Sequence, residues 1–446
     1  MQLKSFSLLV MLTFVGTAHA DWTRFRGPNG SGIAPDNQPV PTTWSDTENL
    51  KWKFALPGPG SSSPIVVGNK VFITCWSGYA TDPQNPGSLE DLKRHLICVD
   101  RATGKELWNR AIKAKLPEGR YGGMFAQHGY ASHTPVSDGK NVYVHFGKSG
   151  VFAFDLDGKQ LWQGDVGDGL NARNWGSSSS PILHNNLLIV TASAESQAMV
   201  AFDTGNGREV WRQVAGGFDN TWGSPVVASV DGRDDIVLSV PGEIWGINPE
   251  TGKLRWFSAG LRGDSVCGSA IVQDGVVYAM ADRGGGSVAV KAGGKGDVSQ
   301  SHVIWTGGNG SRIPTPVFWQ GRLYWISGSL VNCRDAKTGQ EIYSERLPGD
   351  EALAGGQGGQ SGPGGFGGRG GGGFGAGDYA SPVVANGHLY QVSRSGQTVV
   401  IKLGEKFELI ARNRFTSDSS DFSATPAISG GQLFLRSARN LYCVGK

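Results

Sequence analysis

The side chains best suited to chemistry in this 446-residue sequence lie shortly before a repeated motif that usually reads Ser/Thr-Pro. Examples of these segments are "QHGYASHTP", "ARNWGSSSSP" and "FDNTWGSP". Imidazole, guanidinium and aromatic groups together can line a polar pocket or a rim that docks a peptide. The candidate residues are His128, Tyr130, His133, Arg173, Trp175, Trp222, Arg262, Arg312, Tyr379 and Phe422.

Two interpretations of this set remain open from the sequence. In the first, the rings and charges surround the mouth of an axial channel, above a collar of hydroxyl groups. In the second, the rings plug the channel and the hydroxyl groups cap the ends of strands. The collar residues are Ser63, Thr134, Ser180, Ser224, Ser269, Thr315, Ser381 and Thr425.

Internal repetition predicts the elements that position these residues. A hydroxyl residue, a proline, an apolar pair, a turn and an alternating strand recur eight times, mostly at a period of roughly 45 residues. Each copy has room for four short strands, which is typical of a β-propeller blade. The copies are centred on Pro64, Pro135, Pro181, Pro225, Ala270, Pro316, Pro382 and Pro426. We therefore expect an all-β, eight-bladed propeller of four-stranded antiparallel blades.

A second motif, "CVDRATGKELW" at residues 98–108, also recurs along the chain. The small residue is expected to leave room for a neighbouring blade, and the Gly to supply the positive φ of a turn. The large ring at the end can fill the wedge that opens between radiating blades. The residues expected to dock in this way are Trp52, Trp108, Trp162, Trp211, Trp256, Trp305 and Tyr343.

Cysteines occupy the small position in three copies, as Cys98, Cys333 and Cys443. We interpret them as buried packing residues and not as redox or metal ligands. A disulfide between Cys75 and Cys98 stays open as an alternative.

The last copy, "NLYCVGK", lacks room for its fourth strand. The segment "ENLKWKFAL" carries Trp52 and is expected to supply that strand, closing the ring without an exposed edge. The expected organisation is a signal peptide at 1–20, an irregular arm at 21–48 and a propeller at 49–446. A Gly-rich disordered insertion at 350–378 is expected between blades six and seven.

The first twenty residues predict export. They hold one positive charge, an apolar run and small residues at Ala18 and Ala20, and no Cys follows them directly. We expect a periplasmic or secreted monomer that is not a lipoprotein and has no membrane span. The formal net charge of +3 is too small to indicate a nucleic-acid partner.

Familiar catalytic and metal motifs are missing from the sequence. It contains no G-x-S-x-G, no H-E-x-x-H and no phosphate-binding loop, and its eight His residues have no metal-ligand spacing. The acidic stretches "FDLDG" and "DGRDD" are interpreted as hairpin turns and not as calcium loops. The sequence therefore offers no catalytic or metal-binding residue.

Loop lengths favour one face of the propeller. The D–A and B–C loops of a four-stranded blade share a face, and long insertions such as "NRAIKAKLPEGRYGGMFAQHGYAS" fall on it. Variable loops on a rigid scaffold are where binding sites are usually built. We expect function on the D–A face.

The repeated Ala-x-Asp-x-x-Thr-Gly-x-x-x-Trp pattern resembles the tryptophan-docking motif of pyrroloquinoline-quinone (PQQ) type propellers. This family includes quinoprotein alcohol dehydrogenases and the non-enzymatic BamB scaffold of outer-membrane assembly. The resemblance covers about Leu50 to Lys446, and "FRGPNGSG" is similar to the N-terminal segment of exported PQQ-like repeat proteins. It implies the propeller fold more strongly than it implies an activity.

The sequence departs from the diagnostic residues of both groups. It has no adjacent Cys pair and no recognisable calcium and quinone ligand set, and it lacks the lipid-modified Cys of BamB-like proteins. We therefore expect a non-catalytic scaffold that binds a protein, peptide or glycan through its D–A face. The alternative is a quinoprotein-like oxidoreductase with PQQ and calcium in the axial pocket.

Overall fold

The computed structural model describes residues 21–35, 39–82, 84–123, 125–170, 173–281, 285–348 and 379–446. The expected signal peptide at 1–20 and the expected Gly-rich insertion at 350–378 lie outside the described residues. Strands dominate the described chain, and its only helical elements are five short 3₁₀ turns. These turns are η1 (Pro28–Gly30), η2 (Leu89–Asp91), η3 (Phe125–Gln127), η4 (Gly147–Ser149) and η5 (Gly216–Phe218).

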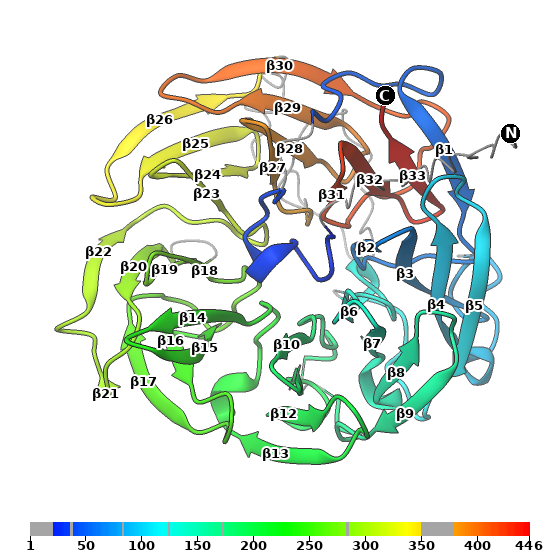
Figure 1. Ribbon diagram of the computed structural model, residues 1–446, viewed down its shortest axis with the longest axis horizontal. Coiled ribbons are helices and arrows are strands. Elements are labelled where there is room, and N and C mark those ends of the chain that lie inside the picture. The colour runs from blue at the N-terminus through cyan, green and yellow to red at the C-terminus, as the bar shows by residue number, and fades with distance from the viewer. Residues whose placement is uncertain are drawn as a thin grey trace, which may run out of the picture.

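Eight sheets radiate around a central axis, which confirms the predicted eight-bladed propeller (Figure 1). In each blade four antiparallel strands run outward from the axis in the order A, B, C, D. The first four blades are β2 (Ile65–Val67), β3 (Lys70–Ser77), β4 (Lys93–Asp100), β5 (Glu106–Lys113); β6 (Val136–Ser137), β7 (Asn141–His145), β8 (Val151–Asp155), β9 (Gln160–Gly164); β10 (Ile182–His184), β11 (Leu187–Ala192), β12 (Ala198–Asp203), β13 (Glu209–Val214); and β14 (Val226–Val230), β15 (Arg233–Val240), β16 (Glu243–Ile247), β17 (Leu254–Ala259).

The remaining blades follow the same plan, with two variations. Blade 4 gains a fifth, parallel strand, β21 (Gly296–Asp297), beside β17. Blade 8 takes its outer strand from the N-terminal side, because β1 (Leu50–Ala55) pairs antiparallel with β33. Blades 5 to 8 also contain β18 (Ile271–Gln273), β19 (Val276–Met280), β20 (Ser287–Lys291), β22 (Val303–Gly307); β23 (Val317–Trp319), β24 (Arg322–Ser327), β25 (Leu330–Asp335), β26 (Glu341–Arg346); β27 (Val383–Ala385), β28 (His388–Val392), β29 (Thr398–Lys402), β30 (Glu408–Asn413); and β31 (Ala427–Ser429), β32 (Gln432–Arg436), β33 (Asn440–Val444).

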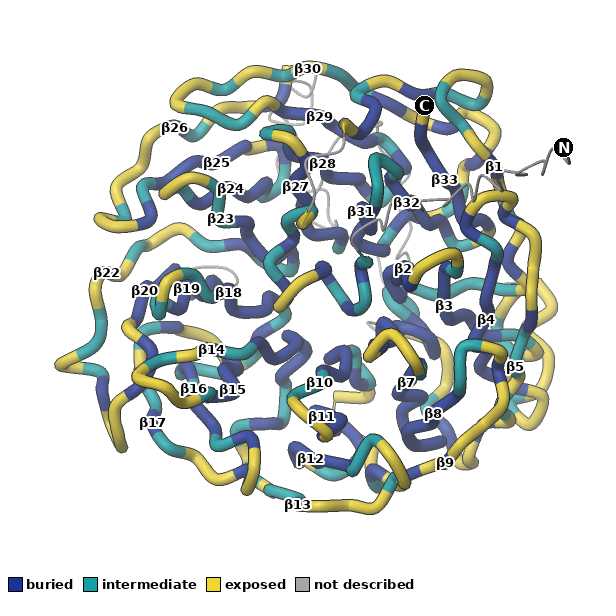
Figure 2. Tube along the Cα trace, viewed as in Figure 1, coloured by how far each residue is buried: buried dark blue, intermediate teal, exposed yellow. Residues whose placement is uncertain are grey.

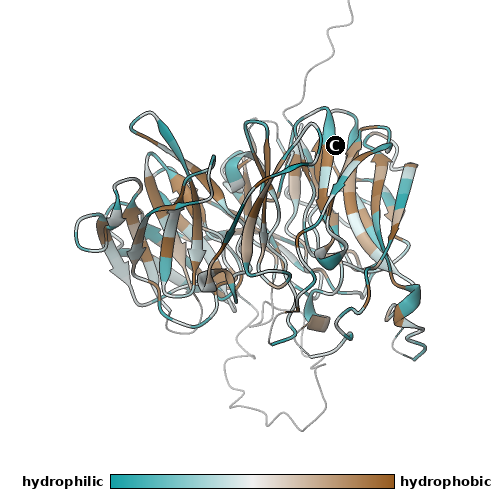
Figure 3. Ribbon diagram, turned by 90° about the horizontal axis from the view of Figure 1, so that it is seen from below, coloured by the Kyte–Doolittle hydropathy of each residue, from teal (hydrophilic) through white to brown (hydrophobic). Residues whose placement is uncertain are grey.

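The hydrophobic core lies in the seams between blades. One buried cluster joins blade 2 to blade 3, another joins blade 3 to blade 4, and equivalent clusters fill the other seams. Inner strands are buried, whereas outer strands such as β13 and β22 are largely exposed (Figure 2). Seen edge-on, hydrophobic residues concentrate in the blades and hydrophilic residues in the loops (Figure 3). The rigid wall around the axis is therefore built from many small, repeated interfaces.

The docking motif joins each blade to the next. The indole Nε1 of Trp162 donates to the carbonyl oxygen of Thr204 at 2.8 Å, and its ring lies against Gly207 in the same turn. Gly207 has φ +73°, so this Gly supplies the expected turn conformation and also makes room for the ring. Equivalent bonds link Trp52 to Arg101, Trp108 to Leu156, Trp211 to Pro249 and Trp305 to Ala336.

The small residue of the motif lies in the cluster shared with the neighbouring blade, and it also makes room for the ring of its own blade. Ala201 lies directly across the strand pair from Trp211, and Cys98 lies across from Trp108. Gly246 shows the reason most clearly, because a Cβ there would lie 1.9 Å from the ring of Trp256.

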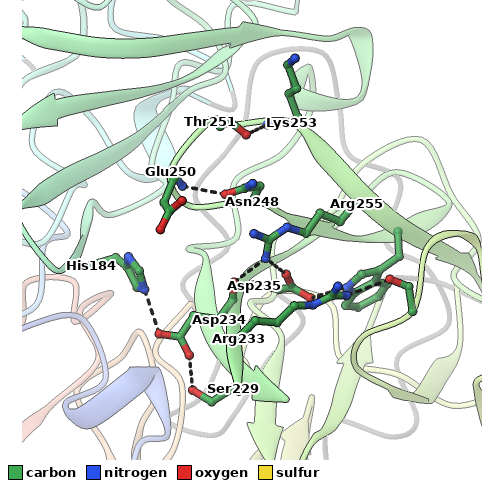
Figure 4. Close-up of polar contacts among 12 residues, drawn as sticks. His184, Ser229, Arg233, Asp234, Asp235, Asn248, Glu250, Thr251, Lys253 and Arg255 are labelled. Atoms are coloured by element: carbon green, nitrogen blue, oxygen red, sulfur yellow. Dashed lines mark hydrogen bonds and ion pairs between the residues drawn. The ribbon is translucent and has the colours of Figure 1, made fainter. Parts of the chain in front are cut away.

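Trp256 departs from the docking pattern. Its Nε1 donates at 2.8 Å to Asp235 of its own blade, and Asp235 also pairs with Arg255 at 2.5 Å (Figure 4). The next blade replaces the short turn of the motif with a longer segment that contains β21, so the usual carbonyl partner is lost there. The ring is nonetheless fully buried in the seam between blades 4 and 5.

All five cysteines are unbridged, and Cys98, Cys333 and Cys443 are buried at the small position. Cys75 faces His95 and Cys98 faces Phe72 across the same strand pair, so no disulfide joins them. Burial raises the pKa of the Cys98 thiol to about 12, which keeps it protonated and unreactive at neutral pH.

A matched pair of glycines tests the docking contact. Gly207 and Gly232 share φ +73°, but a Cβ at Gly207 would lie 2.6 Å from Trp162, whereas nothing lies within 4 Å of one at Gly232. We expect Gly207→Ala to cost about 1 to 2 kcal/mol more unfolding free energy than Gly232→Ala, because only the first displaces a docked ring. Urea unfolding of both variants measures the difference; equal losses would show that the backbone conformation alone matters.

Candidate functional site

The collar of hydroxyl groups forms a hydrogen-bonded ring around the axis. In seven of the eight seams, a backbone N–H of one collar residue donates to the hydroxyl oxygen of the next, always in the same direction. The bonds run from Ser63 to Thr134 (2.9 Å), Thr134 to Ser180 (3.0 Å), Ser180 to Ser224 (2.9 Å), Ser224 to Ser269 (2.8 Å), Ser269 to Thr315 (2.9 Å), Thr315 to Ser381 (2.9 Å) and Ser381 to Thr425 (2.9 Å). The collar therefore ties neighbouring blades together at their inner strands.

The N-terminal arm crosses the axis below the collar (Figure 1). Trp22 pairs with Val66 in blade 1, and Ile33 pairs with Val384 in blade 7. Between these points, Arg24 donates to the carbonyl oxygen of Pro225 in blade 4 at 2.7 Å. The motif "FRGPNGSG" thus lies inside the ring, where its side chains contact the inner strands of several blades.

Above the arm, an axial pocket of about 440 Å³ lies among the D–A loops. Phe25 of the arm and seven collar residues, Ser63 excepted, line its deeper part. Six of the ten candidate rim residues also line this pocket: His128, Arg173, Trp175, Trp222, Arg312 and Tyr379. The structure therefore brings together residues that are far apart in the sequence, from His128 to Tyr379.

The rim combines aromatic rings with charged groups. Trp175 and Trp222 pack with ring centroids 5.5 Å apart, and the guanidinium of Arg173 lies 5.0 Å from the Trp175 ring centre. Arg173 also pairs with Asp264 at 2.6 Å, and this contact holds the pKa of the Asp264 carboxyl below its usual value. On the other side of the rim, Tyr379 lies beneath a second guanidinium, that of Arg394. The rings give the pocket apolar walls with cations at their edges.

His128 is a neutral, fully engaged member of the pocket wall. One ring nitrogen lies 2.6 Å from the Ser132 hydroxyl, and the other lies 2.6 Å from the carbonyl oxygen of Trp175. The carbonyl can only accept, so Nε2 carries the proton and Nδ1 accepts from Ser132. Burial lowers the pKa of His128 to about 4. It fixes the position of the Trp175 loop and is not poised to exchange a proton at neutral pH.

Four candidate residues lie elsewhere. Phe422 is buried against Tyr442 in a hydrophobic cluster of blades 7 and 8 and does not line the pocket. Arg262 is exposed on the loop beside the pocket, and its backbone N–H donates to the carbonyl oxygen of Gly285. Tyr130 and His133 turn away from the axis into a separate buried cluster. Their positions before strand A could not reveal which way their side chains point.

This buried cluster lies between blades 1, 2 and 3 and was not predicted. Arg94 pairs with Glu118 at 2.6 Å, with both side chains no more than 5% exposed. The Ser177 hydroxyl donates to Glu195 at 2.5 Å, and burial raises the pKa of the Glu195 carboxyl. A small cavity of about 40 Å³ lies among these groups. No local motif marks them, because Arg94 lies on β4 and the other three residues lie in separate loops.

The stacked rings of His133 and His145 complete the cluster, with centroids 4.1 Å apart. Neither nitrogen of His145 has a hydrogen-bond partner among the described residues. Burial lowers the pKa of His145 to about 3, and burial together with His145 and Arg94 lowers the pKa of His133 well below its usual value. Both rings are therefore neutral at ordinary pH.

The described residues around the axial pocket do not fit a calcium site. Calcium prefers several carboxylate and carbonyl oxygens, whereas Asp264 is the one carboxylate among the described lining residues and is bound to Arg173. Within the ranges that the structure describes, no three His, Cys, Asp or Glu residues are grouped to hold a metal ion. The hairpin interpretation of the two acidic stretches is supported, because Asp157 and Asp231 lie in tight turns between paired strands.

Comparison with known proteins adds the family. The family model described as outer membrane protein assembly factor BamB matches residues 92–344. The chain belongs to the BamB family. Tetrathionate hydrolase from Acidithiobacillus ferrooxidans is 23% identical over 340 residues, which are 68% of this chain and 62% of the hydrolase. BamB from Burkholderia pseudomallei is 28% identical over 154 residues, 34% of this chain and 30% of that protein. The chain thus spans less than two thirds of either relative.

Solved structures share the fold of this BamB-family chain at low sequence identity. BamB from Moraxella catarrhalis superposes with a TM-score of 0.59 at 11% identity, covering 89% of this chain and 97% of that one. A europium-containing methanol dehydrogenase reaches 0.63 at 11% identity, covering 94% and 90%. These structural similarities establish the propeller fold but do not indicate an activity for this chain. No helix in the described part of the chain has the length and apolar character needed to cross a membrane.

Proposed function

We propose that this BamB-family chain is an exported, non-catalytic scaffold that binds a protein, peptide or glycan of the cell envelope through its D–A face. The observation that carries the proposal is the axial pocket, which the D–A loops surround while the arm occupies the axis below it. A pocket with aromatic walls and a few oriented polar groups suits ligand binding. Among the described lining residues, His128 and Ser132 lie 2.6 Å apart, but burial lowers the pKa of His128 to about 4, which makes it a weak general base at neutral pH.

The family and the sequence support the cellular setting. The matching family is described as an assembly factor of the outer membrane. The secretory signal at 1–20, the arm at 21–48 and the propeller at 49–446 fit an exported scaffold in this setting. We assign it to the periplasm or the exterior, as a monomer without a lipid anchor.

Site-specific photo-cross-linking in the native envelope tests the proposed face. A cross-linker replaces Arg262 on the D–A side or, as control, Arg208, which is exposed in the C–D turn between β12 and β13 on the opposite side. We expect discrete partner adducts from position 262 only. Adducts from both positions, or none from position 262, would contradict a binding face at the D–A loops.

A rim variant separates binding from folding. Combined Trp175→Ala and Trp222→Ala is expected to reduce the cross-linked adduct at least about tenfold, because two adjoining rings leave the pocket wall. Trp319→Ala removes a similarly half-buried ring at the end of β23 and should leave the adduct unchanged. If the rim variant loses its cooperative thermal transition, the rings are structural plugs and the rim assignment is wrong.

The oxidoreductase alternative is tested in the same preparation. Purified protein is mixed with PQQ and calcium, and its spectrum and dye-linked alcohol oxidation are followed. Saturable quinone binding with turnover would overturn the scaffold proposal. The absence of both, with cross-linking retained, is the expected result.

A further inference from the structure

The collar hydroxyl groups have hydrogen-bonding capacity that the protein leaves unused. A Ser or Thr hydroxyl has one hydrogen to donate and two lone pairs to accept. Each of the seven collar bonds uses one lone pair of a hydroxyl oxygen and leaves its hydrogen available. In the part of the chain that the structure describes, no protein acceptor receives a hydrogen bond from these seven hydroxyl groups. The collar therefore presents a ring of hydroxyl hydrogens that can be donated to a ligand.

These donors are buried and border a single space. The seven side chains are no more than 5% exposed, and all of them line the axial pocket. Backbone atoms of the neighbouring blades already hold the oxygen atoms in place, so the donors are positioned before any ligand arrives. Buried polar groups are rarely left without a partner. An acceptor on the axis would satisfy several of them at once.

The charges around the pocket select the kind of acceptor. Among the described lining residues, Arg173 and Arg312 are cationic, and Asp264 is anionic and paired with Arg173. His128 is held neutral by burial and by its two hydrogen bonds. A site with many hydrogen-bond donors, guanidinium groups among them, favours an anionic oxygen group over a cation. Aromatic walls above the collar would cover the less polar body of the same ligand.

We propose that the axial pocket binds an oxyanion, namely a carboxylate, sulfate or sulfonate group, with its oxygens at the hydroxyl collar. The body of the ligand then lies above the collar between Trp222 and Tyr379, and Arg312 also lines this space. The inference rests on the proposed role of this pocket as the binding site of the D–A face. It deepens that role by naming the chemistry that the pocket recognises.

Calorimetric titration at low ionic strength tests the chemistry with four probes: sodium sulfate, glucuronate, N-acetylglycine and neutral glucose. Saturable binding of one or more anions, competed by the others, is expected, while glucose should not bind. The tightest anion identifies the source: glucuronate an acidic sugar, N-acetylglycine a peptide carboxylate, and sulfate a free inorganic oxyanion. Failure of every anion to bind at millimolar concentration, or equal binding of glucose and glucuronate, overturns the proposal.

Variants of the collar and the rim locate the binding. Thr315→Val removes a donor at nearly constant volume, whereas Thr315→Ser keeps the hydroxyl; we expect about tenfold weaker binding only for the first. Arg312→Gln should weaken anion binding about tenfold or more, and Arg208→Gln on the opposite face should not. Thr315→Val also loses an inter-blade bond, so Arg312→Gln decides the matter if that variant does not fold. Unchanged binding in Arg312→Gln overturns the proposed site.

The result is separable from the test of the proposed function. If cross-linking from position 262 succeeds while no anion binds, the oxyanion inference fails and the scaffold proposal stands. If anions bind at the collar while no partner is cross-linked, the scaffold proposal fails and the oxyanion site stands.

Discussion

Arg26→Ala is expected to lower the free energy of unfolding by roughly 3 to 5 kcal/mol, although Arg26 touches no proposed ligand. Its guanidinium donates to the carbonyl oxygens of Thr315 at 2.6 Å, Pro316 at 2.7 Å and Ser31 at 3.2 Å. The side chain is fully buried, and burial lowers its pKa to about 9, so it stays charged at neutral pH. Alanine would leave a cavity, and two buried carbonyl groups and one partly buried carbonyl group would lose their donor.

Urea unfolding followed by tryptophan fluorescence measures this loss at constant m-value. Arg26→Lys should recover only part of it, because an ammonium cannot reproduce the planar fork that reaches two adjacent carbonyls. Arg208→Ala, in an exposed turn, is the control and should change stability by less than about 0.5 kcal/mol. A similarly small loss of unfolding free energy for Arg26→Ala would mean that the contacts of the arm do not stabilise the propeller.

The structural importance of the arm could not be predicted from its sequence. "FRGPNGSG" has no strand periodicity, and an irregular segment was the only expectation that its residues supported. Arg26 contacts a carbonyl 289 positions later in the chain. Such a contact depends on how the whole ring closes and has no local signal. The propeller itself was predictable because each blade repeats the same short-range pattern.

The candidate site was predictable to the extent that it follows the repeat. One hydroxyl per blade at a constant position necessarily forms a ring, so the collar could be read from spacing alone. Loop residues do not repeat, and their side-chain directions depend on non-local packing: Trp175 faces the axis, whereas His133 turns toward Ser177. The buried Arg94 and Glu118 pair was missed for the same reason, since Arg94 lies on β4 and Glu118 in the loop between β5 and β6.

Acid is expected to destabilise the protein at pH values well above those at which its carboxylates titrate. His128 has a pKa of about 4 and His145 of about 3, and His133 is also well below the usual value of 6.5. Between pH 6.5 and pH 4 the unfolded chain therefore binds protons at these three sites and the folded chain does not. Stability is then fully present above pH 6.5 and falls as the pH is lowered, at about 1.4 kcal/mol per proton and pH unit.

The size of the effect includes one opposing group. Burial raises the pKa of Glu195, so the folded state holds a proton there that the unfolded state releases above its usual pKa of 4.5. This group favours the folded state as the pH falls and offsets part of the loss. Each of the three histidines is expected to lower the free energy of unfolding by about 2 kcal/mol between pH 7 and pH 5, and Glu195 reduces their combined effect. Arg94, Glu118 and Lys148 border the same cavity, and their charges set the field in which both histidines and Glu195 titrate.

His145→Leu assigns this dependence to the buried cluster. Since the two ring nitrogens of His145 have no hydrogen-bond partner among the described residues, leucine removes a titrating group without orphaning another. We expect the slope of unfolding free energy against pH to fall by the contribution of about one proton. Between pH 7 and pH 5 the variant should therefore lose about 2 kcal/mol less unfolding free energy than the wild type. His388→Gln, at a hairpin between β27 and β28 and outside the buried cluster, is the control variant. A slope unchanged by His145→Leu would show that acid acts elsewhere, because a neutral buried imidazole must contribute to it.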